Sequence, residues 1–257
     1  MDLISTYIIH LADNALILGH RNSEWTGHGP ILEQDIAISN IALDLVGQAR
    51  NFYQLAAAQL NELMPGENIT EDDLAYLRDV NEFTNLILVE QSNGDWAKTI
   101  LRQFYFSTYQ GLLYNELLKS TSSEIAGISE KSLKETRYHI KWSSEWVTRL
   151  GDGTEESHTR MLDAMQSLNP WIAEIFTPVD FEYEAASSGT GILPEILKGE
   201  WYRRVNSILD AATLPQLSSE NQPMQILSGK NGVHSENLGN LLAEMQFLQR
   251  EYPGSDW

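Results

Sequence analysis

Apolar side chains recur at helical spacing through most of the chain, and glycine and proline interrupt them in only a few places. The longest uninterrupted patterns predict helices over 3–19, 31–60, 96–120, 122–150 and 155–167. Shorter patterns predict helices over 71–79, 194–212 and 235–251, an irregular segment over 177–194 and a polar loop over 214–232. No alternating pattern predicts a pair of strands, so the sequence indicates an all-α fold.

The connections between the first four long helices indicate how these helices pair. The links within the first pair and within the second pair suit antiparallel hairpins, whereas a stretch with its own short helix separates the two pairs. Two hairpins joined by one long crossover describe the ferritin-like four-helix bundle. We therefore predict a single domain over 1–257, with a bundle core at about 3–150 and a C-terminal helical extension at about 155–257.

The predicted helix over 31–60 contains a line of polar side chains among apolar residues. The line consists of Asn40, Asp44, Gln48 and Asn51. Because the rest of the circumference is mostly apolar, we expect a buried helix whose polar line faces the bundle interior. Burying each polar group costs about 1–3 kcal/mol unless it finds a partner. Two interpretations remain open: a hydrogen-bond network that fixes helix register, or a polar site or its remains.

A di-iron centre is the demanding test of a polar site in such a bundle. It needs a Glu from each of two helices and a Glu-x-x-His pair from each of the others. The second helix has Asp44 followed by Gly47, and glycine offers no imidazole. On the fourth helix His139 comes one residue too late after Glu135, rotated by about 100°. The third helix has no acidic residue between 96 and 115, and the first offers only Asp13, so we expect no metal in this bundle.

One literal Glu-x-x-His match exists, from Glu155 to His158, but it follows a Gly-Asp-Gly turn where acidic residues favour a helix start. We assign no catalytic, cofactor-binding or metal-binding residue to this chain. Six side chains are interpreted instead as a relict polar core: Asp13, Asn40, Asp44, Gln48, Glu135 and His139. The alternative is a self-sufficient oxygenase with an atypical metal site built from Asp13, Asp44, Glu135 and His139.

Charge and composition narrow the classes of partner. The chain has 17 basic and 36 acidic side chains, a net charge of −19, which argues against nucleic acid and anionic lipid as partners. It has no cysteine, which excludes disulfides, zinc–thiolate sites and cysteine nucleophiles. The first residues lack a basic segment and no stretch reaches the length of a membrane span, so we expect a cytoplasmic protein.

Several segments, in order along nearly the whole chain, resemble the phenylacetic acid catabolic family, and within it the structural subunits of phenylacetyl-CoA 1,2-epoxidase complexes. The segments are 11–18 (LADNALIL), 24–28 (EWTGH), 44–52 (DLVGQARNF), 88–95 (LVEQSNGD), 134–139 (KETRYH), 149–154 (RLGDGT), 232–239 (GVHSENLG) and 242–246 (LAEMQ). Any one of these segments would be weak evidence, whereas together they are specific.

The resemblance implies a ferritin-like fold and a role in a bacterial multicomponent monooxygenase that epoxidises the ring of phenylacetyl-CoA with dioxygen and NADPH. It implies a homologous catalytic subunit that carries the di-iron site, a small bridging subunit and a flavin/iron–sulfur reductase as partners. This chain would bind no cofactor of its own and would pair with the di-iron subunit, with a homodimer left open for the isolated chain. A free-standing binding protein is the remaining alternative.

Aromatic residues and a glycine-rich loop supply candidate contacts for such an assembly. Five aromatic residues are candidate interface anchors, with the core as the alternative place for each: Trp25, Trp142, Trp146, Trp201 and Tyr202. Lys230, beside Gly229, Gly232 and His234, is a candidate contact for a CoA phosphate, with a plain loop before the last helix as the alternative.

Overall fold

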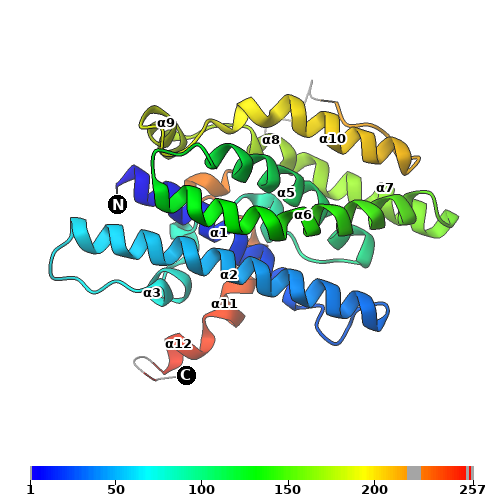
Figure 1. The fold of residues 1–257 in the computed structure, drawn as a ribbon. Coiled ribbons are helices and arrows are strands. Elements are labelled where there is room, and N and C mark those ends of the chain that lie inside the picture. Colours follow the sequence, from blue (N-terminus) through cyan, green and yellow to red (C-terminus); the bar gives the residue numbers. More distant parts are fainter. Residues whose placement is uncertain (1, 219–226, 253–254, 256–257) are drawn as a thin grey trace. The chain divides into compact units, whose positions relative to one another are not determined.

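A computed structural model of the protein describes residues 2–218, 227–252 and 255. Within these ranges all regular structure is helical, apart from isolated bridges between Pro65 and Glu67 and between Ser228 and Val233 (Figure 1). The prediction of an all-α fold is therefore confirmed. None of the helices in the described ranges is long and apolar enough to cross a membrane.

The contacts divide the chain into two compact units, each built around one of the predicted hairpins. The first unit comprises Met1–Ser92, Val179–Ala185 and Leu227–Trp257, and the second comprises Asn93–Pro178 and Ala186–Ile226. The C-terminal part of the chain is thus shared between the units, since each takes segments from it. That the two hairpins form one ferritin-like bundle in a single domain stays a prediction.

The first unit is organised by an antiparallel pair of long helices, α1 (Leu3–Ser23) and α2 (Leu32–Leu63), seen in blue in Figure 1. Their direction follows from their contacts, because the Tyr53 hydroxyl donates to Asp13 in mid-helix while Gly19 lies against Val46. The shorter elements of this unit are α3 (Glu71–Tyr76), η1 (Val80–Glu82), α4 (Ile87–Glu90), η4 (Gly229–Asn231), α11 (Glu236–Met245) and α12 (Phe247–Glu251). A further helix, α9 (Asp180–Ser187), begins in this unit.

Of the two long helices in the first unit, α1 is buried on nearly all sides, and the prediction that α2 is buried all round is wrong. On α1 the aliphatic residues from Ile8 to Leu18 are at most 4% exposed. On α2, by contrast, Leu32 is 72%, Ile36 52% and Leu43 70% exposed. These three side chains recur on one face of the helix, so α2 packs one side against its own unit and leaves an apolar face uncovered.

The second unit is organised by α5 (Trp96–Leu117) and α6 (Ser123–Gly151), which also run antiparallel. Trp96 packs edge-on against Trp142 at 5.9 Å between ring centroids, and Thr136 donates to Gln110 at 3.4 Å. The other elements are α7 (Glu155–Leu168), η2 (Asn169–Trp171), α8 (Ile172–Ile175), η3 (Pro194–Leu197) and α10 (Lys198–Ala211).

Three of the candidate interface anchors belong to the core of the second unit. Trp201 is 0%, Tyr202 6% and Trp142 7% exposed, so the core interpretation holds for these residues. Trp25 and Trp146 are half-buried.

The predicted helix boundaries match closely where local capping fixes them. Thr70 and Asp73 form a capping box at the start of α3, and Ser122 caps α6 through a 3.2 Å bond from the Ile125 amide. The structure differs from the prediction over 177–194, where α9 stands in place of an irregular segment, and it adds the one-turn helices α4 and α8. Such short helices have little stability of their own and depend on tertiary packing. Part of the predicted loop over 214–232 lies outside the described residues.

Candidate functional site

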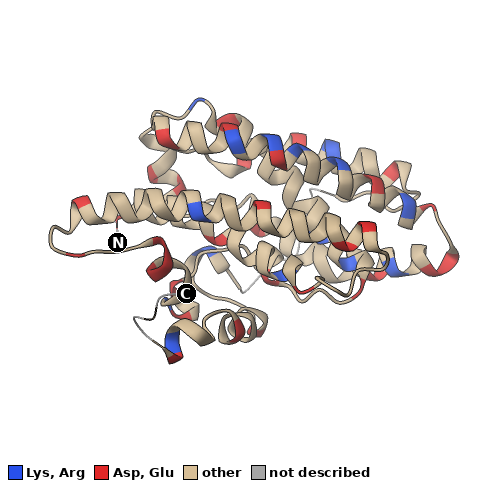
Figure 2. Cartoon of the chain, turned by 60° about the horizontal axis from the view of Figure 1, so that its bottom comes forward, with Lys and Arg blue, Asp and Glu red and all other residues tan. Residues whose placement is uncertain are grey.

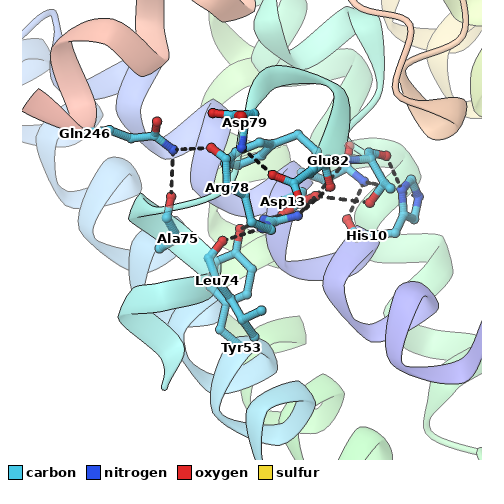
Figure 3. A network of polar contacts seen from close by, with 12 residues as sticks. His10, Asp13, Tyr53, Leu74, Ala75, Arg78, Asp79, Glu82 and Gln246 are labelled. Atoms are coloured by element: carbon cyan, nitrogen blue, oxygen red, sulfur yellow. Dashed lines mark hydrogen bonds and ion pairs between the residues drawn. The ribbon is translucent and has the colours of Figure 1, made fainter. Parts of the chain in front are cut away.

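The most elaborate polar arrangement in the first unit surrounds Asp13, at the middle of α1 (Figure 3). The Tyr53 hydroxyl donates to its Oδ1 at 2.5 Å, and the Arg78 guanidinium binds both carboxylate oxygens. Thr84 donates to Oδ2 twice, from its amide at 2.7 Å and from its hydroxyl at 3.0 Å. A carboxylate has about four lone-pair directions. The oxygens of Asp13, which is 0% exposed, are therefore fully engaged by the protein itself.

Arg78 supplies the positive charge that balances Asp13. Burial by itself disfavours the charged guanidinium, but the charge and hydrogen bond of Asp13 together with the nearby Tyr53 and Glu82 outweigh it and raise the pKa of Arg78 above its usual value. The guanidinium also lies over the Phe83 ring, 4.1 Å from its centroid, and donates to the Tyr53 hydroxyl at 3.1 Å. For Tyr53, burial and then the charge of Asp13 raise the pKa of the phenol, so it remains a neutral donor.

The backbone around Arg78 is held from several sides, as Figure 3 shows. Its side chain donates to the Leu74 carbonyl at 2.5 Å and to the Glu82 carbonyl at 2.8 Å. The Arg78 carbonyl in turn accepts bonds from Gln246 at 3.0 Å and from Arg250 at 2.9 Å. Residues near the C-terminus are therefore hydrogen-bonded to the segment that carries Arg78.

The same face of α1 holds the following segment through His10 and Asn14. His10 Nδ1 donates to the Thr84 carbonyl at 2.6 Å, and the Asn14 side chain accepts from the Leu86 amide at 2.9 Å. The Asn14 amide group also lies 3.2 Å from His10 Nε2, which suits a neutral imidazole that accepts there. Burial and then the charge of Lys230 lower the pKa of His10 to about 3.

A second buried carboxylate, Glu90, ties the end of this segment to the C-terminal part of the unit. It accepts from His234 Nδ1 at 2.7 Å, from the Ser235 amide at 2.7 Å and from the Asn85 side chain at 3.0 Å. His234 Nε2 lies 2.9 Å from the Phe83 carbonyl, so both ring nitrogens face acceptors. Burial opposes the charge of His234, but Glu90 prevails and raises its pKa, consistent with an imidazolium.

Lys230 is not available to a CoA phosphate. Its side chain is fully buried and binds both oxygens of Glu182, at 2.9 and 3.0 Å. The glycines beside it serve close packing, since a Cβ at Gly229 would lie 2.0 Å from the Asn85 carbonyl oxygen and one at Gly232 2.4 Å from that of Asn81. The alternative prediction, a structural loop before the last helix, describes this segment.

The predicted polar line on α2 does not face one interior. Asn40 is exposed, Asp44 and Asn51 are half-buried, and Gln48 is buried. The expectation that the whole line points inward is therefore wrong, because the helix leaves the side that carries Asn40 and Leu43 in solvent. Of the relict polar core on this unit, Asp13 and Gln48 are fully buried.

In the second unit, His139 is buried on α6 and Glu135 is half-buried. The facing helix, α5, offers amide and phenol groups that bond to neutral partners. Gln103 donates to Ser107 at 2.7 Å, and Gln110 donates to Tyr114 at 3.0 Å. The Glu155 to His158 match is a helix start, where Glu155 is exposed and His158 lies 2.6 Å from the Gly151 carbonyl oxygen.

These residues do not fit a di-iron centre. Within the described ranges there is no group of three or more His, Asp or Glu side chains placed to hold a metal ion. Asp13, the carboxylate of α1, is saturated by an arginine, a tyrosine and a threonine. Hard cations need several anionic oxygens with free lone pairs, which this arrangement does not leave.

Sequence reasoning missed most members of this network. Arg78, Tyr53 and Thr84 lie 65, 40 and 71 residues from Asp13, so no helical periodicity connects them. Glu90 and His234 belong to LVEQSNGD and GVHSENLG, two of the segments that carry the family resemblance. That resemblance was the available signal for these two residues.

The neutral state of His10 predicts a pH dependence of stability. As the pH falls below 6.5, the unfolded chain protonates this histidine while the folded chain does not until about pH 3. The free energy of unfolding should therefore decrease by about 1.4 kcal/mol per pH unit from this group alone. In His10→Gln, urea unfolding between pH 6 and 4.5 should show a shallower slope than the wild type. An unaltered slope in His10→Gln would contradict the assignment.

Comparison with known proteins identifies the family of the chain. The family model described as phenylacetic acid catabolic protein matches residues 2–257. The C subunit of the 1,2-phenylacetyl-CoA epoxidase of Escherichia coli (strain K12) is 41% identical over 259 residues, which cover 100% of both chains. The protein therefore belongs to the phenylacetic acid catabolic protein family.

Proposed function

We propose that this chain is a non-catalytic structural subunit of a phenylacetyl-CoA 1,2-epoxidase in aerobic phenylacetate catabolism. It pairs with and stabilises a homologous di-iron catalytic subunit, and a small bridging subunit and a flavin/iron–sulfur reductase complete the complex. The proposal includes a ferritin-like bundle and a cytoplasmic location. The full-length similarity to one subunit of the Escherichia coli epoxidase supports the pathway and the membership of a complex.

The observation that carries the non-catalytic role is the saturation of Asp13. A carboxylate at the middle of a bundle helix is where a di-iron protein needs a metal ligand. Here Arg78 and Tyr53 bind it instead, so the balancing cation is a side chain. This supports a bundle that keeps its shape without iron.

Iron analysis of the isolated chain, combined with an assay for dioxygen-dependent turnover, tests this role against the self-sufficient oxygenase. We expect less than stoichiometric iron and no epoxidation by the chain alone, and activity only when the other subunits of the complex, including the reductase, are added with NADPH. Stoichiometric iron bound through Asp13 or Asp44 would overturn the proposal.

Pairing is supported by the uncovered apolar face of α2. Leu32, Ile36 and Leu43 are each more than half exposed, and a group of large exposed apolar side chains on one helix face commonly marks a protein interface. In the proposed complex this face meets the di-iron subunit.

Leu43→Glu should therefore weaken association with the di-iron subunit at least about tenfold, because a charge replaces an apolar contact. The stability of the isolated chain should be unchanged, since Leu43 is 70% exposed there. Leu63→Glu, at the far end of the same helix and 56% exposed, is the matched control. Co-purification and titration calorimetry measure the affinity of both variants for the di-iron subunit. Equal affinities would contradict this placement of the interface.

A further inference from the structure

The outer face of α6 carries a row of positive charges that stands out in a strongly acidic protein. Figure 2 shows acidic positions spread along many of the helices. Five of the 17 Lys and Arg side chains of the whole chain nevertheless lie within α6. Lys134, Arg137 and Lys141 are all exposed, and their spacing of three and four residues places them on one face. We call these three residues the α6 cationic row.

Most exposed cations elsewhere in the described residues have an acidic neighbour. Lys119 lies 2.7 Å from Glu116, Arg203 2.6 Å from Glu200, and Arg204 2.7 Å from the same carboxylate. Arg160 and Arg250 are paired as well, at 2.6 Å and 2.9 Å from their acidic neighbours.

On α6 this compensation is nearly absent. Among the described residues, Arg137 and Lys141 have no carboxylate within ion-pair distance, and Lys134 only approaches Glu130, at 4.0 Å. Like charges three or four residues apart on a helix destabilise it by about 0.2–0.5 kcal/mol per pair. The repulsion within the row is offset only in part by Glu130 beside Lys134, and an external anion would relieve it further.

We propose that the α6 cationic row is a docking surface for an acidic protein surface on another subunit of the complex. This inference rests on the proposed function, which supplies the other subunits. The row extends about 10 Å along a convex helix face, and small anions such as CoA are bound mainly in concave sites. A second copy of this chain is disfavoured as partner, because two chains of net charge −19 repel each other.

Tyr138 lies beside the row and is 47% exposed, which adds an aromatic contact of the kind enriched at protein interfaces. The surface thus combines two cations that have no ion-pair partner among the described residues, a third that lies 4.0 Å from Glu130, and one large amphipathic ring. An acidic partner would gain both a faster association, through electrostatic steering, and a contact that excludes water.

The test is a triple charge reversal, Lys134→Glu with Arg137→Glu and Lys141→Glu, measured against each of the other epoxidase subunits purified separately. We expect one subunit to bind the variant at least tenfold more weakly at 50 mM NaCl, with the difference shrinking at 500 mM as salt screens the charges. The control is Lys119→Glu with Arg203→Glu and Arg204→Glu, which changes the net charge equally at exposed, ion-paired positions. Equal weakening by both triples, or by neither, would overturn the proposal.

Photo-crosslinking identifies the partner surface directly. With p-benzoylphenylalanine in place of Tyr138, the crosslinked peptide should come from another subunit and be rich in Asp and Glu. A crosslink to a second copy of this chain, to an uncharged peptide or to none would overturn the docking surface. If the complex assembles normally in these cases, the proposed function stands, whereas failure of the wild-type chain to bind any other epoxidase protein would overturn both.

Discussion

Replacing Arg78 with methionine is expected to lower the free energy of unfolding by about 3–5 kcal/mol. The change leaves Asp13 charged and fully buried, with only Tyr53 and Thr84 as hydrogen-bond donors. The free energy of unfolding falls because a charge is left in the protein interior without a partner. This cost is larger than the net contribution of the ion pair itself. Urea unfolding followed by circular dichroism measures it.

The matched double variant, Asp13→Asn with Arg78→Met, separates the charge from the packing. Removing both charges should recover part of the loss, because no isolated ion then remains in the interior. Arg50→Met is a surface control in the same unit, since the Arg50 side chain is 68% exposed and its pair with Glu71 should contribute at most about 1 kcal/mol. A loss below 1 kcal/mol in Arg78→Met would show that the network does not hold the unit together.

The position of this network explains why the effect should be large. Arg78 and Thr84 lie in the crossover that follows α2, and both contact Asp13. Gln246, near the end of the chain, is hydrogen-bonded to the same crossover. Asp13 is thus the point where α1, α2 and the crossover meet. A carboxylate in this position organises the unit in the way a metal would, through several ligands drawn from distant parts of the chain.

Much of the helical layout could be predicted because its signals are local. The predicted helix over 122–150 is observed as Ser123–Gly151, since a serine cap and a glycine-containing turn fix its ends. The two antiparallel hairpins followed from a moderate link within the first pair of helices and a short link within the second pair. Each of these features depends on neighbours in the sequence.

The orientation of α2 could not be predicted in the same way. Ile36 and Leu43 read as core residues, yet both are more than half exposed. An apolar face that is covered by a partner protein has the same sequence pattern as one that is covered by the chain's own core. The pattern alone therefore does not distinguish an interior helix from an interface helix.

The partners of Asp13 could not be predicted from the sequence for a different reason. The sequence placed Asp13 in a relict polar core, and it did not provide a full set of iron ligands. It did not indicate Arg78, which lies in a short connecting segment without periodicity and 65 residues away. The glycines beside Lys230 led to the prediction that it contacts a CoA phosphate. In the structure these glycines allow the loop to lie against the backbone of Asn81 and Asn85.

In the second unit, Trp201→Ala should lower the free energy of unfolding by about 3–5 kcal/mol. The indole is 0% exposed and packs against Phe176 at 5.4 Å, Tyr105 at 5.5 Å and Tyr202 at 5.1 Å between ring centroids. Its nitrogen also donates to the Tyr105 carbonyl at 3.0 Å. Truncation therefore removes the centre of an aromatic cluster and leaves a cavity that rigid neighbouring rings fill poorly.

Hydrogen exchange locates this loss within the unit. The slowest amides of α5 and α10 should exchange at least about 100-fold faster in Trp201→Ala, since each 1.4 kcal/mol corresponds to a factor of ten. Trp201→Phe keeps most of the ring and loses mainly the bond to Tyr105, so it should lower the free energy of unfolding by only about 1–2 kcal/mol. Equal exchange in the two variants would mean that the hydrogen bond, and not the packing of the rings, stabilises the junction between α5 and α10.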